Sequence, residues 1–175
     1  MKAKTSNVLY PAVAQFVLKM YGEDQAMRWA NASDASVWDD QMDKRHADQL
    51  QPIIVGIGWL TVSKVGKPAS QAAALLVRHF DHNTDLQKMC LDLMKASPRG
   101  EVDLSDVAHL EDRICVNLRK PQIYGTQFHE VKGKDVPRPI CNPTRVDERR
   151  KMMGLPTLAQ GVIDLRQKYA GNWNR

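Results

Sequence analysis

The chain is a succession of amphipathic helical patterns broken by glycine and proline, and this succession restricts its fold most strongly. In the stretch 39–57, for example, Leu50, Ile54 and Ile57 recur on one side at helical spacing. No segment shows the alternation of strand, helix and strand that a parallel α/β sheet requires. The predicted helices span residues 8–20, 23–30, 39–57, 70–79, 85–96, 104–118, 145–153 and 157–169.

A short β element is predicted after the sixth of these helices. Residues 123–131 and 136–140 have the pattern of a hairpin about a turn at 132–135. Pro137 and Pro139 cannot donate to a strand ladder, so the second strand must lie at an edge. We therefore expect a mainly α protein, a compact single-domain helical fold over residues 1–175 with a small antiparallel β hairpin.

The composition argues against export and against a membrane protein. The longest apolar stretches, such as residues 53–60, are far shorter than the roughly 20 residues that a membrane span needs. Lys19 interrupts the apolar pattern that a signal peptide would require near the N-terminus. The cysteines at 90, 115 and 141 are too scattered for a disulfide framework or a CxxC metal site. We expect a cytoplasmic protein with reduced thiols.

The net charge of +5 raises the question of nucleic acid. Lys2, Lys4 and Arg175 place part of this charge at the chain ends, and acids such as Asp164 interrupt the basic C-terminal region. Aromatic residues total 6%, and only Trp173 lies clear of the apolar patterns, so stacking platforms for bases are lacking. We expect no specific nucleic-acid partner. The sequence indicates no oligomeric state.

Polar side chains at apolar helix positions are the first candidates for a site. His79 continues the seam of Ala72 and Leu76 on the 70–79 helix, and Asp81 and His82 follow where that helix ends. Together they supply donors, acceptors and a group that titrates near neutral pH. The structural alternative is a core histidine that is hydrogen-bonded to a carbonyl.

A second candidate pair lies on the 39–57 helix. Asp43 and His46 are three residues apart, so they meet on one helix face in line with the apolar seam. Asp43 could fix the tautomer of His46, or both could bind a metal. The alternative is that this first turn, with Asp39, projects into water.

The 104–118 helix places acids close to its apolar face. Glu111 projects near the centre of that face, Asp112 toward its border and Arg113 nearly opposite. Periodicity therefore indicates Glu111 as the acid under most constraint, because uncompensated burial of a carboxylate costs on the order of several kcal/mol. Its structural alternative is an acid paired within the fold.

The densest polar signal follows that helix. Gln122 and Gln127 flank a segment in which strand alternation puts Tyr124 and Thr126 on one side. Gly125 permits a close backbone approach. We expect this segment to form one wall of a pocket. The alternative is an ordinary strand start with surface amides.

Three ordered segments resemble a bacterial family that is classed only as a domain of unknown function. These are 75–81 (LLVRHFD), 110–113 (LEDR) and 122–127 (QIYGTQ), and the resemblance covers roughly residues 40–160. The chain departs from the family at Arg78, where Gln is usual, and at Leu60, where Pro is usual. The resemblance implies a role for Asp112 and Arg113 rather than Glu111, and it implies no reaction.

These observations predict a small cytoplasmic enzyme, hydrolase- or lyase-like, that acts on a polar or anionic small molecule. His79 would serve as general acid or base, Asp112 would orient a partner and Arg113 would bind an anion, while Tyr124 and Gln127 would hydrogen-bond the substrate. The side chains expected to contribute to substrate binding are Asp43, His46, Asp81, Gln122 and Thr126.

Two questions about this function stay open at the level of sequence. No nucleotide-cofactor motif is present, but Asp43, His46, His79 and Asp112 are ligand types for a divalent metal, although from three separate helices. The alternative to an enzyme is a non-catalytic ligand-binding or protein-interaction module, in which the same residues form a structural hydrogen-bond network.

Overall fold

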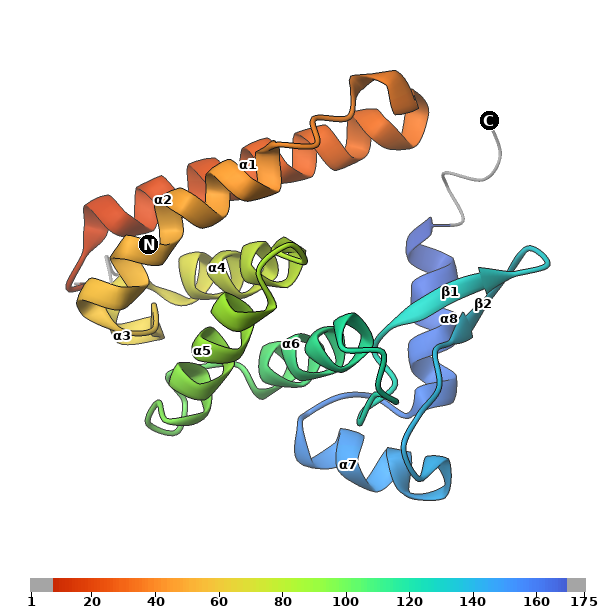
Figure 1. Ribbon diagram of the computed structural model, residues 1–175. Coiled ribbons are helices and arrows are strands. Elements are labelled where there is room, and N and C mark those ends of the chain that lie inside the picture. The colour runs from red at the N-terminus through yellow and green to blue at the C-terminus, as the bar shows by residue number, and fades with distance from the viewer. Residues whose placement is uncertain (1–7, 170–175) are drawn as a thin grey trace, which may run out of the picture. The chain divides into compact units, whose positions relative to one another are not determined.

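The computed structural model describes residues 8–169 and confirms a mainly α protein with one small antiparallel sheet (Figure 1). Lys2, Lys4, Trp173 and Arg175, which entered the charge and stacking arguments, lie outside the described residues. The chain divides into two compact units, Met1–Asp103 and Leu104–Arg175. Whether these two units associate into a single domain, as the sequence predicts, stays a prediction.

The first unit is helical. It comprises α1 (Pro11–Ser33), the 3-10 helix η1 (Ala35–Val37), α2 (Met42–Ile57), α3 (Val62–Val65), α4 (Lys67–His79) and α5 (Thr84–Lys95). The chain turns at η1, so α2 returns beside α1, and α4 packs against both (Figure 1). Val17, Leu50, Leu76 and Phe80 are fully buried in its core.

The helix boundaries differ from the predicted ones in two instructive places. One continuous α1 replaces the two helices expected at 8–20 and 23–30, because Gly22 is exposed and a single glycine costs a helix only about 1 kcal/mol. The helix expected from residue 39 begins at Met42 instead. There the Asp39 carboxylate accepts the Gln41 backbone N–H at 2.9 Å and forms a turn before the helix.

The second unit combines helices with the hairpin. It comprises α6 (Leu104–Asn117), β1 (Phe128–Val131), β2 (Lys134–Pro137), the 3-10 helix η2 (Pro143–Arg145), α7 (Val146–Met152) and α8 (Leu158–Tyr169). The strands pair antiparallel with Phe128 opposite Pro137. The sheet is shorter than predicted: residues 123–127 form a loop, because the N–H groups of Ile123, Tyr124 and Thr126 bond to the Asp112 side chain of α6 and not to a neighbouring strand.

Gly125 lies where that loop approaches other parts of the second unit. Its φ is +72°, and an added Cβ would lie 2.9 Å from side-chain atoms of both Ile140 and Leu158. Gly133, in the hairpin turn, has a similar φ of +73° with nothing within 4 Å of the position of a Cβ. Both glycines therefore adopt a left-handed backbone conformation that other residues rarely adopt, but only at Gly125 would a side chain also collide with its neighbours.

No helix in the described part of the chain is long and apolar enough to cross a membrane.

Gly125→Ala should destabilise the protein more than Gly133→Ala. Both changes carry the left-handed backbone penalty of about 1 kcal/mol, and Gly125→Ala adds an overpacking cost of about 1–3 kcal/mol. The measurement is the free energy of unfolding of the full chain in urea, followed by far-UV circular dichroism. Equal losses for the two variants would show that the loop relaxes around the added methyl group.

Candidate functional site

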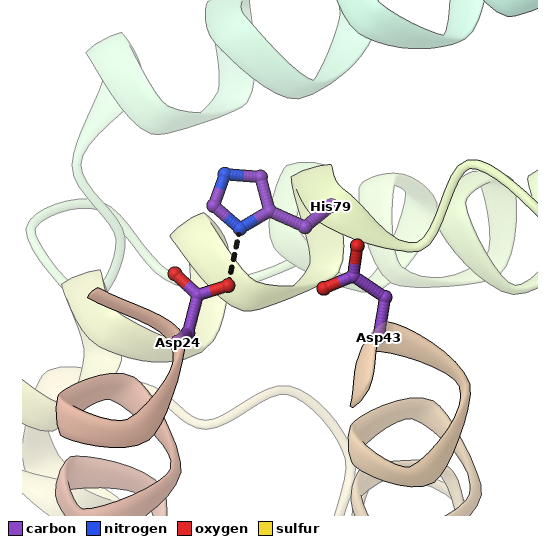
Figure 2. Close-up of side chains that lie close together, drawn as sticks. All are labelled: Asp24, Asp43 and His79. Atoms are coloured by element: carbon purple, nitrogen blue, oxygen red, sulfur yellow. Dashed lines mark hydrogen bonds and ion pairs between the residues drawn. The ribbon is translucent and has the colours of Figure 1, made fainter. Parts of the chain in front are cut away.

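Three ionisable side chains from three helices of the first unit converge at one point (Figure 2). Asp24 comes from α1, Asp43 from the first turn of α2 and His79 from the last turn of α4. One possible ligand atom from each lies within 4.8 Å of those of the other two. Because α1, α2 and α4 pack against one another, the cluster is set by the helix packing of this unit.

Asp24 is the centre of the cluster. Its side chain is 0% exposed, and its Oδ1 accepts from His79 Nδ1 at 2.9 Å and from Arg28 Nε at 2.8 Å. The Gln25 amide donates to Oδ2 at 2.7 Å. Burial alone would raise the pKa of this carboxyl, but the hydrogen bond and charge of His79, the charge of Arg28 and the Gln25 amide outweigh it, so the pKa is lowered from 3.8.

Arg28 joins Asp24 to Asp43. Its Nη2 donates to Asp43 Oδ1 at 2.8 Å, and its guanidinium carbon lies 5.2 Å from the centre of the Trp38 ring. Cation–π contact and two carboxylate partners fix this side chain in place. The guanidinium is thus the cation that compensates both acids.

The geometry assigns different roles to the two nitrogens of His79. An ionised Asp24 can only accept, so Nδ1 carries the hydrogen and Nε2 of the neutral ring holds the lone pair. Nε2 has no hydrogen-bond partner among residues 8–169, and the side chain is 23% exposed. An oriented imidazole with an available Nε2 is the arrangement of a general base.

His46 lies apart from this cluster. The helix spacing predicted that His46 would pair with Asp43, and this prediction was wrong. Asp43 bonds Arg28, and His46 Nε2 lies 3.5 Å from Glu23 Oε2 on α1. The helix-face argument considered partners on α2 alone, whereas α1 supplies a partner for each side chain: Arg28 for Asp43 and Glu23 for His46. His46 is 4% exposed, and its Nδ1 has no partner in the described chain.

Asp81 and His82 are exposed beyond the end of α4. The side chain of the buried Gln87 donates to the carbonyls of Val77 and Arg78 and lies 3.5 Å from Asp81 Oδ1. These contacts satisfy the last carbonyls of α4 and hold the helix end that carries His79.

The second unit has its own buried acid, Asp112. Its carboxylate accepts the backbone N–H groups of Ile123, Tyr124 and Thr126 at 2.7–2.9 Å, and the Thr126 hydroxyl at 2.9 Å. Asp112 is 0% exposed, whereas Glu111, which periodicity indicated as the most constrained acid, is half-buried. The periodicity argument was wrong because loop donors beside α6 compensate the charge of Asp112.

Gln122 fixes the other side of the same loop. It is fully buried; its Nε2 donates to the carbonyls of Gln127 and Arg138 at 2.9 Å, and its Oε1 accepts the Gln127 N–H at 2.8 Å. Arg149 and Arg150 add bonds to the carbonyls of Ile123, Tyr124 and Gly125. The loop is therefore held at nearly every backbone group.

The remaining polar side chains of this loop lie half-buried at its surface. The Tyr124 hydroxyl donates to Glu111 Oε2 at 3.3 Å, and burial together with the charge of Glu111 raises its pKa to about 12. Arg113 Nη1 lies 3.4 Å from Gln127 Oε1, and Gln127 Nε2 donates to the Thr126 hydroxyl. The Tyr124 hydroxyl thus stays protonated over the whole physiological pH range and can donate a hydrogen bond.

The sequence reasoning missed Asp24 and Arg28. A signal was present: Val17, Met20 and Asp24 recur at helical spacing, so the acid continues a buried apolar stripe. Two further donors to the loop, Arg149 and Arg150, were not among the predicted site residues, and no local pattern marks them as donors to a distant segment.

Asp24→Asn should lower the free energy of unfolding by about 2 kcal/mol at pH 7, since charged hydrogen bonds to a buried carboxylate are lost. The folded-state pKa of Asp24 lies below 3.8, so its contribution is complete above that value and is lost as the pH falls through the folded-state pKa. The difference between wild type and variant should therefore shrink in acid. Urea unfolding of the full chain from pH 7 to 3 measures it.

Asp48→Asn is the matched control, because Asp48 is exposed on α2. It should change stability by less than about 0.5 kcal/mol at every pH. A loss for Asp24→Asn that did not change with pH would contradict the assignment of the ionised carboxylate.

Comparison with known proteins identifies a family. The model of a family of unknown function, DUF6624, matches residues 11–172. The match therefore includes α1 with Asp24 and Arg28, as well as the segments that carried the resemblance. Searches of curated proteins and of solved structures found no match. Because the family model covers nearly the whole sequence, the chain belongs to the DUF6624 family of unknown function.

Proposed function

We propose that this protein is an enzyme in which His79, oriented by Asp24, transfers protons to and from a small polar substrate. One observation carries the proposal: a fully buried carboxylate bonds His79 Nδ1 at 2.9 Å, while Nε2 of the part-exposed ring has no partner in the described chain. Such a pair fixes the tautomer and stabilises the imidazolium that forms during reaction.

A hydrolytic reaction fits this arrangement best. Nε2 takes a proton from a water molecule, the water oxygen bonds to an electrophilic centre of the substrate, and the imidazolium returns the proton to the leaving group. Cys90 is no competing nucleophile, because it is buried and its pKa is raised to about 12 by that burial. Asp43, beside the ring, would accept a hydrogen bond from a substrate hydroxyl or amine.

The charges favour an uncharged polar substrate over an anionic one. Asp24 and Asp43 carry two negative charges, and Arg28 supplies one positive charge that both already share. An anion placed at His79 would meet this excess without an uncommitted cation in the cluster. Of the polar or anionic molecules expected from sequence, we therefore propose the polar ones.

The proposal places the protein in the cytoplasm without a specific nucleic-acid partner. No disulfide joins Cys90, Cys115 and Cys141 in the described chain, which fits a reducing compartment. Trp59 is buried and Trp38 lies on Arg28, which removes two stacking platforms. Trp29 is exposed, although the sequence placed it in or beside an apolar pattern. The argument against base stacking at Trp29 therefore depends on charge, because no stripe of basic residues accompanies it on α1.

The test has a spectroscopic and a catalytic measurement. In ¹⁵N-histidine spectra, neutral His79 should be the Nδ1–H tautomer in wild type and lose that preference in Asp24→Asn. A panel of uncharged p-nitrophenyl esters and chromogenic amides should contain a hydrolysed substrate. His79→Gln should slow that hydrolysis at least about 100-fold, and His82→Gln, an exposed control, should leave it unchanged.

An Nε2–H tautomer, or hydrolysis that is indifferent to His79→Gln, would contradict the proposal. If His79→Gln and Asp24→Asn instead cost similar stability and the panel stays inactive, the non-catalytic alternative gains. In that alternative the cluster is a structural hydrogen-bond network like the one around Asp112.

A divalent metal at Asp24, Asp43 and His79 is the second candidate, favoured by the 4.8 Å spacing of their ligand atoms. Arg28 would compete with an ion for these carboxylates, because it bonds Oδ1 of each. His46 and Asp112, the other ligands proposed from sequence, do not belong to this set.

Elemental analysis of untagged protein purified without chelator tests the metal. A resident ion requires about one Zn, Mn or Fe per chain, and Arg28→Met should then tighten metal binding by removing the competing cation. Sub-stoichiometric metal in wild type, with no gain in Arg28→Met, would eliminate this candidate.

A further inference from the structure

Asp43 has one carboxylate oxygen that the fold leaves without a partner. Its Oδ1 accepts from Arg28 Nη2 at 2.8 Å, whereas Oδ2 accepts no hydrogen bond from residues 8–169. The side chain is 21% exposed, and Oδ2 is not among the buried unpartnered atoms of that range. A ligand from solvent can therefore reach this oxygen.

The Asp43 carboxylate belongs to the cluster that contains His79. One of its oxygens is within 4.8 Å of a His79 ring nitrogen and of an Asp24 oxygen. Figure 2 shows both carboxylates beside the His79 side chain. In the described chain Nε2 of His79 also has no partner, and it too is absent from the buried unpartnered atoms. A small molecule can therefore span His79 Nε2 and Asp43 Oδ2.

The charges of the cluster determine which donor Asp43 accepts best. Asp24 and Asp43 share one guanidinium, that of Arg28, so the cluster keeps one net negative charge while His79 is neutral. A hydroxyl and an ammonium group can both donate to Oδ2, but only the ammonium brings the missing positive charge. The charges that disfavour an anion at His79 thus also favour a cation over an uncharged group.

The partial burial of Asp43 strengthens this preference. Exposed ion pairs contribute little because water and salt screen them, whereas partly buried pairs are screened much less. Hydrogen bonds between an ionised donor and an ionised acceptor are roughly twice as strong as neutral ones. At a side chain that is only 21% exposed, an ammonium group should therefore bind measurably more tightly than an uncharged group of the same shape.

We propose that the substrate of the His79 site carries a protonated amine, and that Asp43 Oδ2 is the specificity-determining group that binds it. The inference rests on the proposed hydrolysis and narrows its substrates to esters or amides that also contain an ammonium group. The water oxygen bonds to the carbonyl carbon, and the bond from that carbon to the leaving oxygen or nitrogen breaks. The proton taken by Nε2 passes to the leaving group, and the ammonium is unchanged.

Two matched pairs of unreactive probes test the amine. β-Alaninamide and butanamide differ by an ammonium in place of a methyl group on the acyl side of an amide, and N-acetylethylenediamine and N-propylacetamide differ in the same way on the other side. In NMR titrations of the full chain at pH 7, at least one amine should bind about 10-fold more tightly than its methyl analogue. The signals of Asp43 and of the His79 imidazole should shift with that amine.

Asp43→Asn should reduce this ratio of affinities to about 1, because it removes the charge at nearly constant shape. Asp48→Asn removes the same charge from an exposed position of α2 and should leave the ratio unchanged. Equal binding within both probe pairs would overturn the proposal, as would no saturation by about 20 mM amine or a ratio that survives Asp43→Asn. The wild-type comparison needs no variant, so it decides even if Asp43→Asn does not fold.

The amine site and the hydrolysis can fail separately. Amine binding that depends on Asp43, together with an inactive ester and amide panel, would contradict the hydrolysis and support the amine site. Hydrolysis that depends on His79, without any preference for the amine probes, would overturn the amine site and leave the hydrolysis supported.

Discussion

The ionic hydrogen bonds of the buried Asp24 carboxylate hold the first unit in the form that the site requires. An unpaired carboxylate in a protein interior costs on the order of several kcal/mol, so a chain that buries one must surround it with donors. Arg28 and Gln25 come from the same helix, but His79 must be brought from α4. The packing of α1 on α4 therefore positions the catalytic candidate and satisfies the acid in one contact.

The second unit meets the same requirement at Asp112 with a different kind of donor. There the partners are backbone N–H groups and one hydroxyl, none of which titrates near neutral pH. Such a carboxylate fixes the shape of a loop but leaves no group that can exchange a proton. At Asp24 one partner is the His79 imidazole, whose second nitrogen, Nε2, does not bond Asp24 and can accept a proton. This difference is why the proposed chemistry lies at His79, although the sequence signal was denser at residues 122–127.

The sequence predicted what local physics determines. Helical periodicity predicted the longer helices of both units but not the short α3, and the turn chemistry of residues 132–135 predicted the hairpin. It did not give the conformation of residues 123–127, because strand-like alternation there is overridden by bonds to Asp112, more than ten positions earlier. Pairing Asp43 with His46 failed for a similar reason: spacing within a helix says nothing of the acids and cations on the helix beside it.

Arg28 also decides what His79 can do. With both carboxylates ionised and Arg28 between them, the cluster carries one net negative charge while His79 is neutral. A proton taken up at Nε2 during general-base catalysis places the imidazolium beside Asp24 and Asp43 and makes the cluster neutral. A metal ion bound in place of Arg28 would bring a larger positive charge beside the same ring. The two proposed chemistries of the site therefore compete, and the Arg28 guanidinium, which already bonds both carboxylates, favours proton transfer.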